Sequence, residues 1–420
     1  MLEEAHDHEQ LIARVAALDI GKAELMCCVR VPGKQGQRLQ EIGSYKTMTR
    51  SLLVLADRLQ ELRVSRVVME ATSDYWRPVF YVLEAQGFDC LLVNAHEAKH
   101  LPGRPKTDRL DAVWLAKLAE RDLLRPSFVP PAPIRQLRDL TRYRADLVAV
   151  RTAEKNRVDK LLEDAQIKLS VVASDIFGVS GRAMLAALVA GQRDPNTLAE
   201  LARASLRAKR SQLVEAFTGH FTDHHGFLLG KMLARIDQAD ADIAEVETRI
   251  AAAIVPFAVA VERLAEITGV GRVAAWVLIA EIGVDMSRFP TPGHLVSWAR
   301  FAPGVRQSAG RTKGRSGTGR GNRYLAQVLG EIAVCCGRSD SFLGERYRRL
   351  ARRRGKKRAI VAVGRSVLVI VWHLLSDPQA RFADLGADFY PTHHTTQRAL
   401  RNHVRQLQAM GYKVSLEPVA

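Results

Sequence analysis

The chain has 420 residues, which is long enough for two or three domains that each bury a core. A hydrophobic content of 47% excludes a largely disordered protein. The formal net charge of +17 indicates a polyanionic partner, which is DNA, RNA or an acidic membrane surface.

Targeting and redox signals are weak in this sequence. The first ten residues are acidic and polar, so no signal peptide is expected. The five cysteines form no C-x-x-C pair, which argues against a zinc knuckle and against a disulfide framework. We therefore expect a protein of the reducing cytoplasm, associated with the nucleoid.

The first 125 residues have the pattern of an α/β domain. Short runs rich in apolar and β-branched residues predict strands, and apolar residues at helical spacing predict helices between them. The expected strands are 13–20, 25–31, 38–45, 65–71 and 88–93, and the expected helices are 48–62, 75–86 and 106–122. The proline-rich segment 126–133 predicts the end of this domain.

The middle region, 126–257, is predicted to be helical. Two long stretches, 134–165 and 226–253, carry an apolar stripe and a charged outer face, as in a coiled coil or a helical hairpin. We expect such a region to act as a spacer, to form a dimer interface or to bind nucleic acid.

Four acidic residues of the first domain stand where two strands end and a helix begins. Asp19 and Glu70 end their strands, and Asp108 and Asp111 lie three residues apart at a helix start. Each could have a purely structural role, such as capping a helix. Together they predict a site for Mg²⁺ or Mn²⁺, because carboxylates brought to one sheet edge repel each other unless a divalent cation neutralises them.

A third unit, 258–378, is rich in glycine and basic residues, and a tail of 379–420 with a helix near 396–410 follows it. The segment 267–283 resembles a helix-hairpin-helix, in which Gly269 and Gly271 bracket a tight turn that could bind a phosphate. The apolar segment 359–375 has the composition of a membrane span, but it is short and contains Arg365, so we expect a buried helix.

Positive charge is concentrated between residues 300 and 358, which hold seventeen Lys and Arg but three acidic residues. Ser308 lies between Arg306 and Arg311, whose guanidinium groups could stabilise a phosphoryl transition state. From this chemistry alone, Ser297 and Ser316 remain alternatives. The basic residues expected to bind nucleic acid are Arg300, Arg306, Arg311, Lys313, Arg315, Arg320 and Arg323.

Three motifs of the first domain resemble a known family. ALDIGK with Asp19, VVMEAT with Glu70, and KTDRLDA with Asp108 and Asp111 are similar to the four-carboxylate domain of the insertion-sequence 110 family of transposases, which includes the Piv-type DNA invertases. The resemblance implies a RuvC-like domain with the ribonuclease-H-like fold.

The third unit also resembles the second domain of that family. Ala302 and Pro303, then Ser308, then Gly321 and Asn322 match the family's order of motifs, and Ser308 takes the place of its recombination nucleophile. The sequence departs from the family where Ala309 replaces the usual glycine. The literal Ser-Gly pair is formed by Ser316 and Gly317, which keeps Ser316 as a minor candidate.

The resemblance implies a transposase or recombinase that cuts and rejoins DNA through a phosphoserine intermediate. It also implies homo-oligomers, dimers or tetramers, in which the carboxylates of one subunit meet the serine of another. A structured RNA encoded by the element, which pairs with donor and target DNA, is implied as a guide. Two alternatives remain: a metal-dependent junction-resolving nuclease, and a non-catalytic architectural protein whose four carboxylates would not converge.

Overall fold

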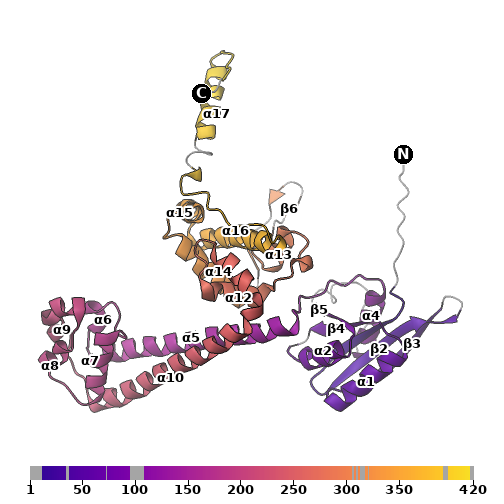
Figure 1. Ribbon diagram of the computed structural model, residues 1–420, viewed down its shortest axis with the longest axis horizontal. Coiled ribbons are helices and arrows are strands. Elements are labelled where there is room, and N and C mark those ends of the chain that lie inside the picture. Colours follow the sequence, from indigo (N-terminus) through magenta and orange to yellow (C-terminus); the bar gives the residue numbers. More distant parts are fainter. Residues whose placement is uncertain are drawn as a thin grey trace. The chain divides into compact units, whose positions relative to one another are not determined.

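The computed structural model describes residues 12–34, 37–71, 73–94, 108–304, 307–308, 311–312, 317–319, 321–390 and 396–416. The chain divides into two compact units, Met1–Val129 and Pro130–Ala420, shown in Figure 1. This division and the predicted boundary at residue 125 both fall at the proline-rich segment. The finer division of residues 130–420 into domains stays a prediction.

The first unit is built on a mixed five-stranded sheet of order β3-β2-β1-β4-β5. The strands are β1 (Val15–Ile20), β2 (Glu24–Pro32), β3 (Arg38–Lys46), β4 (Arg66–Ala71) and β5 (Asp89–Asn94). The first three strands are antiparallel, and β4 and β5 run parallel to β1. All five strands were predicted from the sequence to within two residues, and the sheet fits a ribonuclease-H-like domain.

Helices cover both faces of this sheet. On one face, α1 (Thr49–Glu61) and α2 (Trp76–Ala85) bury Leu55 and Leu83 against Leu18 and Met69. On the other face, α4 (Asp108–Glu120) packs Ala112 and other small apolar residues against β1, β2 and β4. Because both faces of β1 are covered, its residues are apolar almost throughout, as in the central strand of an α/β sheet.

The second unit begins with two long helices, α5 (Ala132–Asp164) and α10 (Asp223–Ala253). They lie antiparallel, because Arg144 pairs with Glu247 at 2.7 Å and His225 near the start of α10 approaches Asp164 at the end of α5. The two helical stretches are therefore confirmed as a helical pair, which we call the arm (Figure 1). A coiled-coil supertwist stays a prediction.

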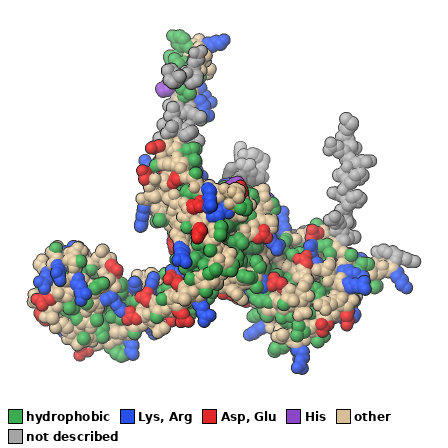
Figure 2. All heavy atoms as spheres, viewed as in Figure 1, with side chains coloured by type: hydrophobic (Ala, Val, Ile, Leu, Met, Phe, Trp, Pro, Cys, Tyr) green, Lys and Arg blue, Asp and Glu red, His purple; other side chains and the backbone are tan. Residues whose placement is uncertain are grey.

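A small helical bundle connects the two helices of the arm. It comprises α6 (Leu169–Val172), α7 (Val179–Val189), α8 (Pro195–Glu200), η2 (Ala204–Lys209) and α9 (Arg210–Ala216). Its core joins Leu185 and Leu213 to Leu162 and Leu229 of the arm. Figure 2 shows Lys and Arg side chains spread over the visible face of this bundle.

The carboxy-terminal part of the second unit is a helical bundle. Its elements are η3 (Val255–Phe257), α11 (Ala258–Ala265), α12 (Arg272–Ile282), η4 (Met286–Arg288), α13 (Pro292–Trp298), α14 (Arg323–Cys336), α15 (Phe342–Arg354) and α16 (Lys356–Ser376). The helix α17 (Thr396–Ala409) follows, where a helix near 396–410 was predicted.

The helix α16 is the element that resembles a membrane span. It has 21 residues, more than the 17 expected, and in the described part of the chain it is the one helix long and apolar enough to cross a membrane. It packs against α11, α13, α14 and α15. A Cβ atom on Gly364 would lie 2.6 Å from the Phe301 ring, so another segment rests directly on the helix backbone. One face of α16 therefore packs into the helical bundle, with 39% of its most apolar 18-residue window buried, and the prediction of a core helix stays a prediction.

Candidate active site and nucleic-acid-binding residues

Asp19 and Glu70 lie next to each other at one edge of the sheet. Leu18 of β1 pairs in parallel register with Met69 of β4, so the following residues on the two strands are also neighbours. Leu18 and Met69 face α1 and α2. Because side chains alternate along a strand, Asp19 and Glu70 belong to the opposite face, which α4 covers. Glu70 is buried and Asp19 is partly buried.

The helix α4 brings its acidic start to the same edge. The carbonyl oxygen of Glu120, at the end of α4, accepts a 2.8 Å hydrogen bond from the backbone N–H of Ile12, which precedes β1. The Glu120 carboxylate also pairs with Arg30, which lies opposite Val15 at the start of β1. A helix of 13 residues and a strand of six are both about 20 Å long, so the start of α4 reaches the end of β1.

Asp19 and Glu70 are therefore neighbours, and the direction and length of α4 put its start, with Asp108 and Asp111, toward the same edge. Asp111 is partly buried, whereas the side chain of Asp108 lies outside the described residues. Among the side chains that are described, no group of three or more His, Cys, Asp or Glu is arranged to hold a metal ion. The donor set nevertheless fits the expected cation, because Mg²⁺ and Mn²⁺ prefer carboxylate oxygens to nitrogen or sulfur ligands.

Residues 299–322, which we call the Ser308 segment, connect the end of α13 to the start of α14. Ser308 lies in the two-residue strand β6 (Gln307–Ser308), which pairs with β7 (Arg311–Thr312) so that Ser308 is opposite Arg311. Two short strands therefore pair antiparallel within this basic segment. Ser297 lies elsewhere, exposed on α13, and Ser316 falls outside the described residues.

The predicted nucleic-acid-binding residues of this segment are described only in part. Arg300 is exposed at its start, with a left-handed backbone φ of 62°. Arg323 is exposed at its end, where it pairs with Asp146 at 3.3 Å and lies over the Tyr324 ring. Arg306, Lys313, Arg315 and Arg320 fall outside the described residues, as do the side chains of Ser308 and Arg311.

The two glycines of the predicted helix-hairpin-helix have different environments. Gly269 lies in the turn between α11 and α12 with φ of 84°, and an added Cβ would lie 2.7 Å from Cys336 Sγ. Burial raises the pKa of the Cys336 thiol to about 12, so the thiol stays protonated and donates to the Thr268 carbonyl oxygen at 3.0 Å. Gly271 is exposed at the start of α12, with no atom within 4 Å of an added Cβ.

We expect Gly269→Ala to lower the free energy of unfolding by about 1–3 kcal/mol, because alanine there combines a steric overlap with a strained φ. Gly271→Ala is the matched control and should cost less than about 1 kcal/mol, because its φ of −82° suits any residue. Chemical denaturation of the full chain measures both values. Equal stability of the two variants would contradict this role for Gly269.

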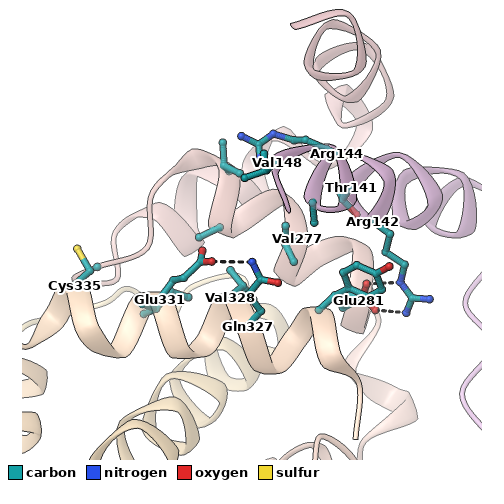
Figure 3. Close-up of a pocket in the computed structure, with 16 residues that line it drawn as sticks. Thr141, Arg142, Arg144, Val148, Val277, Glu281, Gln327, Val328, Glu331 and Cys335 are labelled. Carbon is teal, nitrogen blue, oxygen red and sulfur yellow. Dashed lines mark hydrogen bonds and ion pairs between the residues drawn. The ribbon is translucent and has the colours of Figure 1, made fainter. Parts of the chain in front are cut away.

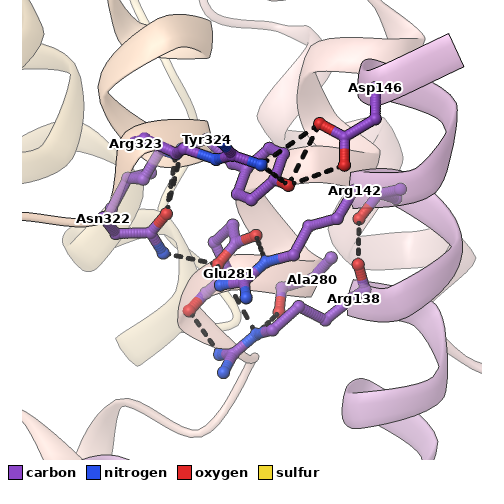
Figure 4. Close-up of polar contacts among 10 residues, drawn as sticks. Arg138, Arg142, Asp146, Ala280, Glu281, Asn322, Arg323 and Tyr324 are labelled. Carbon is purple, nitrogen blue, oxygen red and sulfur yellow. Dashed lines mark hydrogen bonds and ion pairs between the residues drawn. The ribbon is translucent and has the colours of Figure 1, made fainter. Parts of the chain in front are cut away.

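A buried polar cluster at the base of the Ser308 segment was not predicted from the sequence. Glu281 of α12 is fully buried, and its carboxylate accepts two hydrogen bonds from Arg142 of α5, at 2.7 and 2.8 Å (Figure 4). Arg138 donates to the backbone carbonyl oxygens of Ala280 and Glu281, at 2.9 and 2.7 Å. The side-chain amide of Asn322 donates to the same Glu281 carboxylate. The cluster therefore joins α5, α12 and the start of α14.

Arg142 and Glu281 form the charge pair at the centre of this cluster. Burial alone would lower the pKa of Arg142, but the hydrogen bonds and charge of Glu281 raise it above its usual value. Removing one partner of such a pair typically costs about 3–5 kcal/mol, because the other charge is left buried and uncompensated. The signal in the sequence was present: Glu281 is the one acidic residue in an apolar helix, and Arg138 and Arg142 lie four residues apart on one helix face.

A cavity of about 320 Å³ lies beside this cluster, between α5, α12 and α14 (Figure 3). Its walls are apolar at Val148, Val277 and Val328, and polar residues at its rim include Arg144 and Glu331. Gln327 donates to Glu331 at 3.0 Å along α14. The arm and α14 are therefore separated by this cavity where Val148 and Val328 face it.

Comparison with known proteins places this chain in a family. Residues 16–167 match the DEDD transposase model of the IS110 group, and residues 261–348 match the transposase model of the IS116/IS110/IS902 family. A protein described as an uncharacterised product of insertion element IS110 of Streptomyces coelicolor is 30% identical over 115 residues, which is 27% of this chain and 28% of that protein. The two matched segments together span more than half of the sequence, and the chain belongs to the IS110 family of transposases.

Proposed function

We propose that this protein cuts and rejoins DNA strands, with Ser308 as the nucleophile and with Asp19, Glu70, Asp108 and Asp111 as ligands of a divalent cation. The observation that carries the proposal is the sheet register, which makes Asp19 and Glu70 neighbours at the edge that the start of α4 reaches. The matched transposase families support the choice of DNA as substrate.

The chemistry follows from these residues. The Ser308 hydroxyl attacks a phosphodiester phosphorus, its proton leaves to a base, and the bond to the leaving strand breaks as the serine–phosphate bond forms. The intermediate conserves the energy of the phosphodiester, so a second DNA hydroxyl can displace the serine and rejoin the strand without ATP. A bound Mg²⁺ or Mn²⁺ would stabilise negative charge on the reacting phosphate.

A covalent adduct tests the proposal. The full-length protein is incubated with labelled DNA and Mg²⁺, and denaturing electrophoresis followed by peptide mapping locates any labelled residue. A DNA-linked peptide containing Ser308 supports the proposal. Strand cleavage without an adduct would instead favour a metal-dependent nuclease of the junction-resolving kind.

We also propose that a structured RNA guides the reaction and that the protein acts as a homo-oligomer on the bacterial nucleoid, in the cytoplasm. The net charge of +17 accommodates a long polyanion. Sequencing of RNA recovered with the purified protein identifies a guide, and light scattering gives the number of subunits. A monomer free of RNA that still recombines DNA would contradict both parts.

The corner between α15 and α16 is a surface suited to DNA phosphates. Six cations are exposed there: Arg352, Arg353, Arg354, Lys356, Lys357 and Arg358. The nearest acids in sequence, Asp340 and Glu345, already pair with Arg348. Three of the cations lie in the first turn of α16, where positive charge opposes the helix dipole and lowers stability. An anionic partner would offset that cost.

Neutralising Arg352, Arg353 and Arg354 with glutamine should weaken DNA binding by about tenfold or more at moderate salt. The dependence of log affinity on log salt should become shallower by about 2–3, since each phosphate contact contributes about 0.9 to the slope. Fluorescence anisotropy at several salt concentrations measures both effects. The control K34Q/R50Q/R63Q removes the same charge from exposed positions of the first unit. An equal change in that control would indicate net charge alone.

A further inference from the structure

We propose that Glu281 is a positioning residue that, through Asn322, fixes the end of the Ser308 segment to the arm. The inference rests on the proposed role of Ser308 as nucleophile. Asn322 has two roles at one position: its side-chain oxygen caps α14 by accepting from the backbone N–H groups of Tyr324 and Leu325, and its amide donates to Glu281. The residue that begins α14 is thereby tied to α12 and α5.

The two ends of the Ser308 segment lie against each other at this point. An added Cβ on Gly321 would lie 3.0 Å from Cβ and Cγ of Arg300, so the returning chain passes directly over the departing one. The departing end is anchored separately, because Phe301 is buried and its ring rests on Gly364 of α16. The two ends of the Ser308 segment are therefore held close together. The Phe301 ring anchors the departing end to α16, and the Asn322–Glu281 hydrogen bond anchors the returning end to α12.

Polar contacts link the start of α14 directly to the arm. A cavity lies between α5, α12 and α14 beside Thr141 and Val148, while α12 packs on both other helices. The direct contacts across this gap are the Arg142–Glu281–Asn322 chain, the Arg142 guanidinium over the Tyr324 ring at 4.9 Å, and the Tyr324 hydroxyl donating to Asp146 at 3.0 Å (Figure 4). A displacement of α5 would therefore be transmitted to the end of the Ser308 segment through these side chains.

Substitutions at Asn322 separate the cap from the contact with Glu281. Asn322→Ser keeps a good helix cap but is too short to reach Glu281, so the fold should be retained. Asn322→Asp also caps the helix but places a carboxylate against Glu281. The double variant E281Q/N322D exchanges donor and acceptor: the amide introduced at position 281 donates to the carboxylate introduced at position 322, and the total charge of the cluster is unchanged.

The experiment compares the rate of adduct formation at saturating DNA with the affinity for DNA. We expect N322S and N322D to form the adduct about 10- to 100-fold more slowly, because small misplacements of a nucleophile have effects of this size. The dissociation constant for DNA should stay within about twofold, because phosphate contacts set it. The double variant should recover part of the lost rate, to within about tenfold of wild type, because the amide introduced at position 281 can accept from only one of the two Arg142 donors.

Each outcome is decisive. A positioning role is supported if N322S and N322D form the adduct slowly while their DNA affinity and thermal unfolding midpoint stay as in wild type, and if E281Q/N322D recovers part of the rate. A wild-type rate in N322S, or a rate loss that follows the thermal midpoint in every variant, would overturn it. If the wild-type protein forms no adduct, the proposed nucleophile itself is wrong. That result differs from a wild-type adduct whose rate the Asn322 variants leave unchanged, which overturns the positioning role alone.

Discussion

Replacing Ser308 with alanine is expected to abolish the covalent protein–DNA adduct and the recombinant product, while DNA affinity stays within about twofold of wild type. The hydroxyl is the atom that bonds to phosphorus, so its removal eliminates the step rather than slowing it. Ser308 lies in the short strand β6, and a serine-to-alanine change is small enough to leave the β6–β7 pairing intact. The variant Ser308→Cys should retain weak activity, because a thiolate also attacks phosphorus.

The measurement is denaturing electrophoresis with end-labelled DNA, calibrated on the wild-type adduct. Matched controls are Ser316→Ala, which removes the serine of the Ser-Gly pair, and Ser297→Ala on α13. Both should form the adduct at wild-type rates. An adduct that persists in Ser308→Ala, or that disappears in Ser316→Ala, would move the nucleophile to Ser316.

Substituting asparagine for Asp19, Asp108 or Asp111, or glutamine for Glu70, is expected to lower the rate of strand joining by a factor on the order of 10³ or more. Each change removes a charge while keeping the size of the side chain, so the cation site loses affinity but the sheet keeps its shape. Because Glu70 is buried, its glutamine variant also requires a stability measurement.

The control for these variants is Asp57→Asn, an exposed acid on α1, which packs on the opposite face of the sheet. It should recombine DNA at the wild-type rate. Titration of Mg²⁺ and Mn²⁺ gives a second readout, since binding of the cation measured by calorimetry should weaken in the four variants and not in Asp57→Asn. Full activity of Asp19→Asn in the presence of a chelator would exclude a metal role for this edge.

Local patterns in the sequence were enough to locate most secondary structure. The strands around Asp19 and Glu70 and the helix beginning at Asp108 were predicted within two residues, because apolar residues repeat with the strand or helix period and turn residues separate them. The same patterns located the arm helices α5 and α10, and the family motifs led to the prediction that the carboxylates and Ser308 form the site.

Tertiary structure alone decided how these elements meet. The register that makes Asp19 and Glu70 neighbours, and the direction of α4, depend on contacts between strands and helices that no local pattern specifies. The apolar composition of 359–375 made the segment resemble a membrane span, and the contacts of α16 with four other helices show that one of its faces packs in the bundle.

The Glu281 cluster shows the limit of sequence reasoning most clearly. By itself the sequence determined that Asn322 precedes a helix, that Glu281 is an acid in an apolar helix, and that Arg142 lies on a charged one. Arg142 and Glu281 are 139 residues apart, and only folding brings them within 2.7 Å. A buried charge must find its partner wherever the chain supplies one, so the pairing is decided by long-range contacts and not by spacing along the sequence.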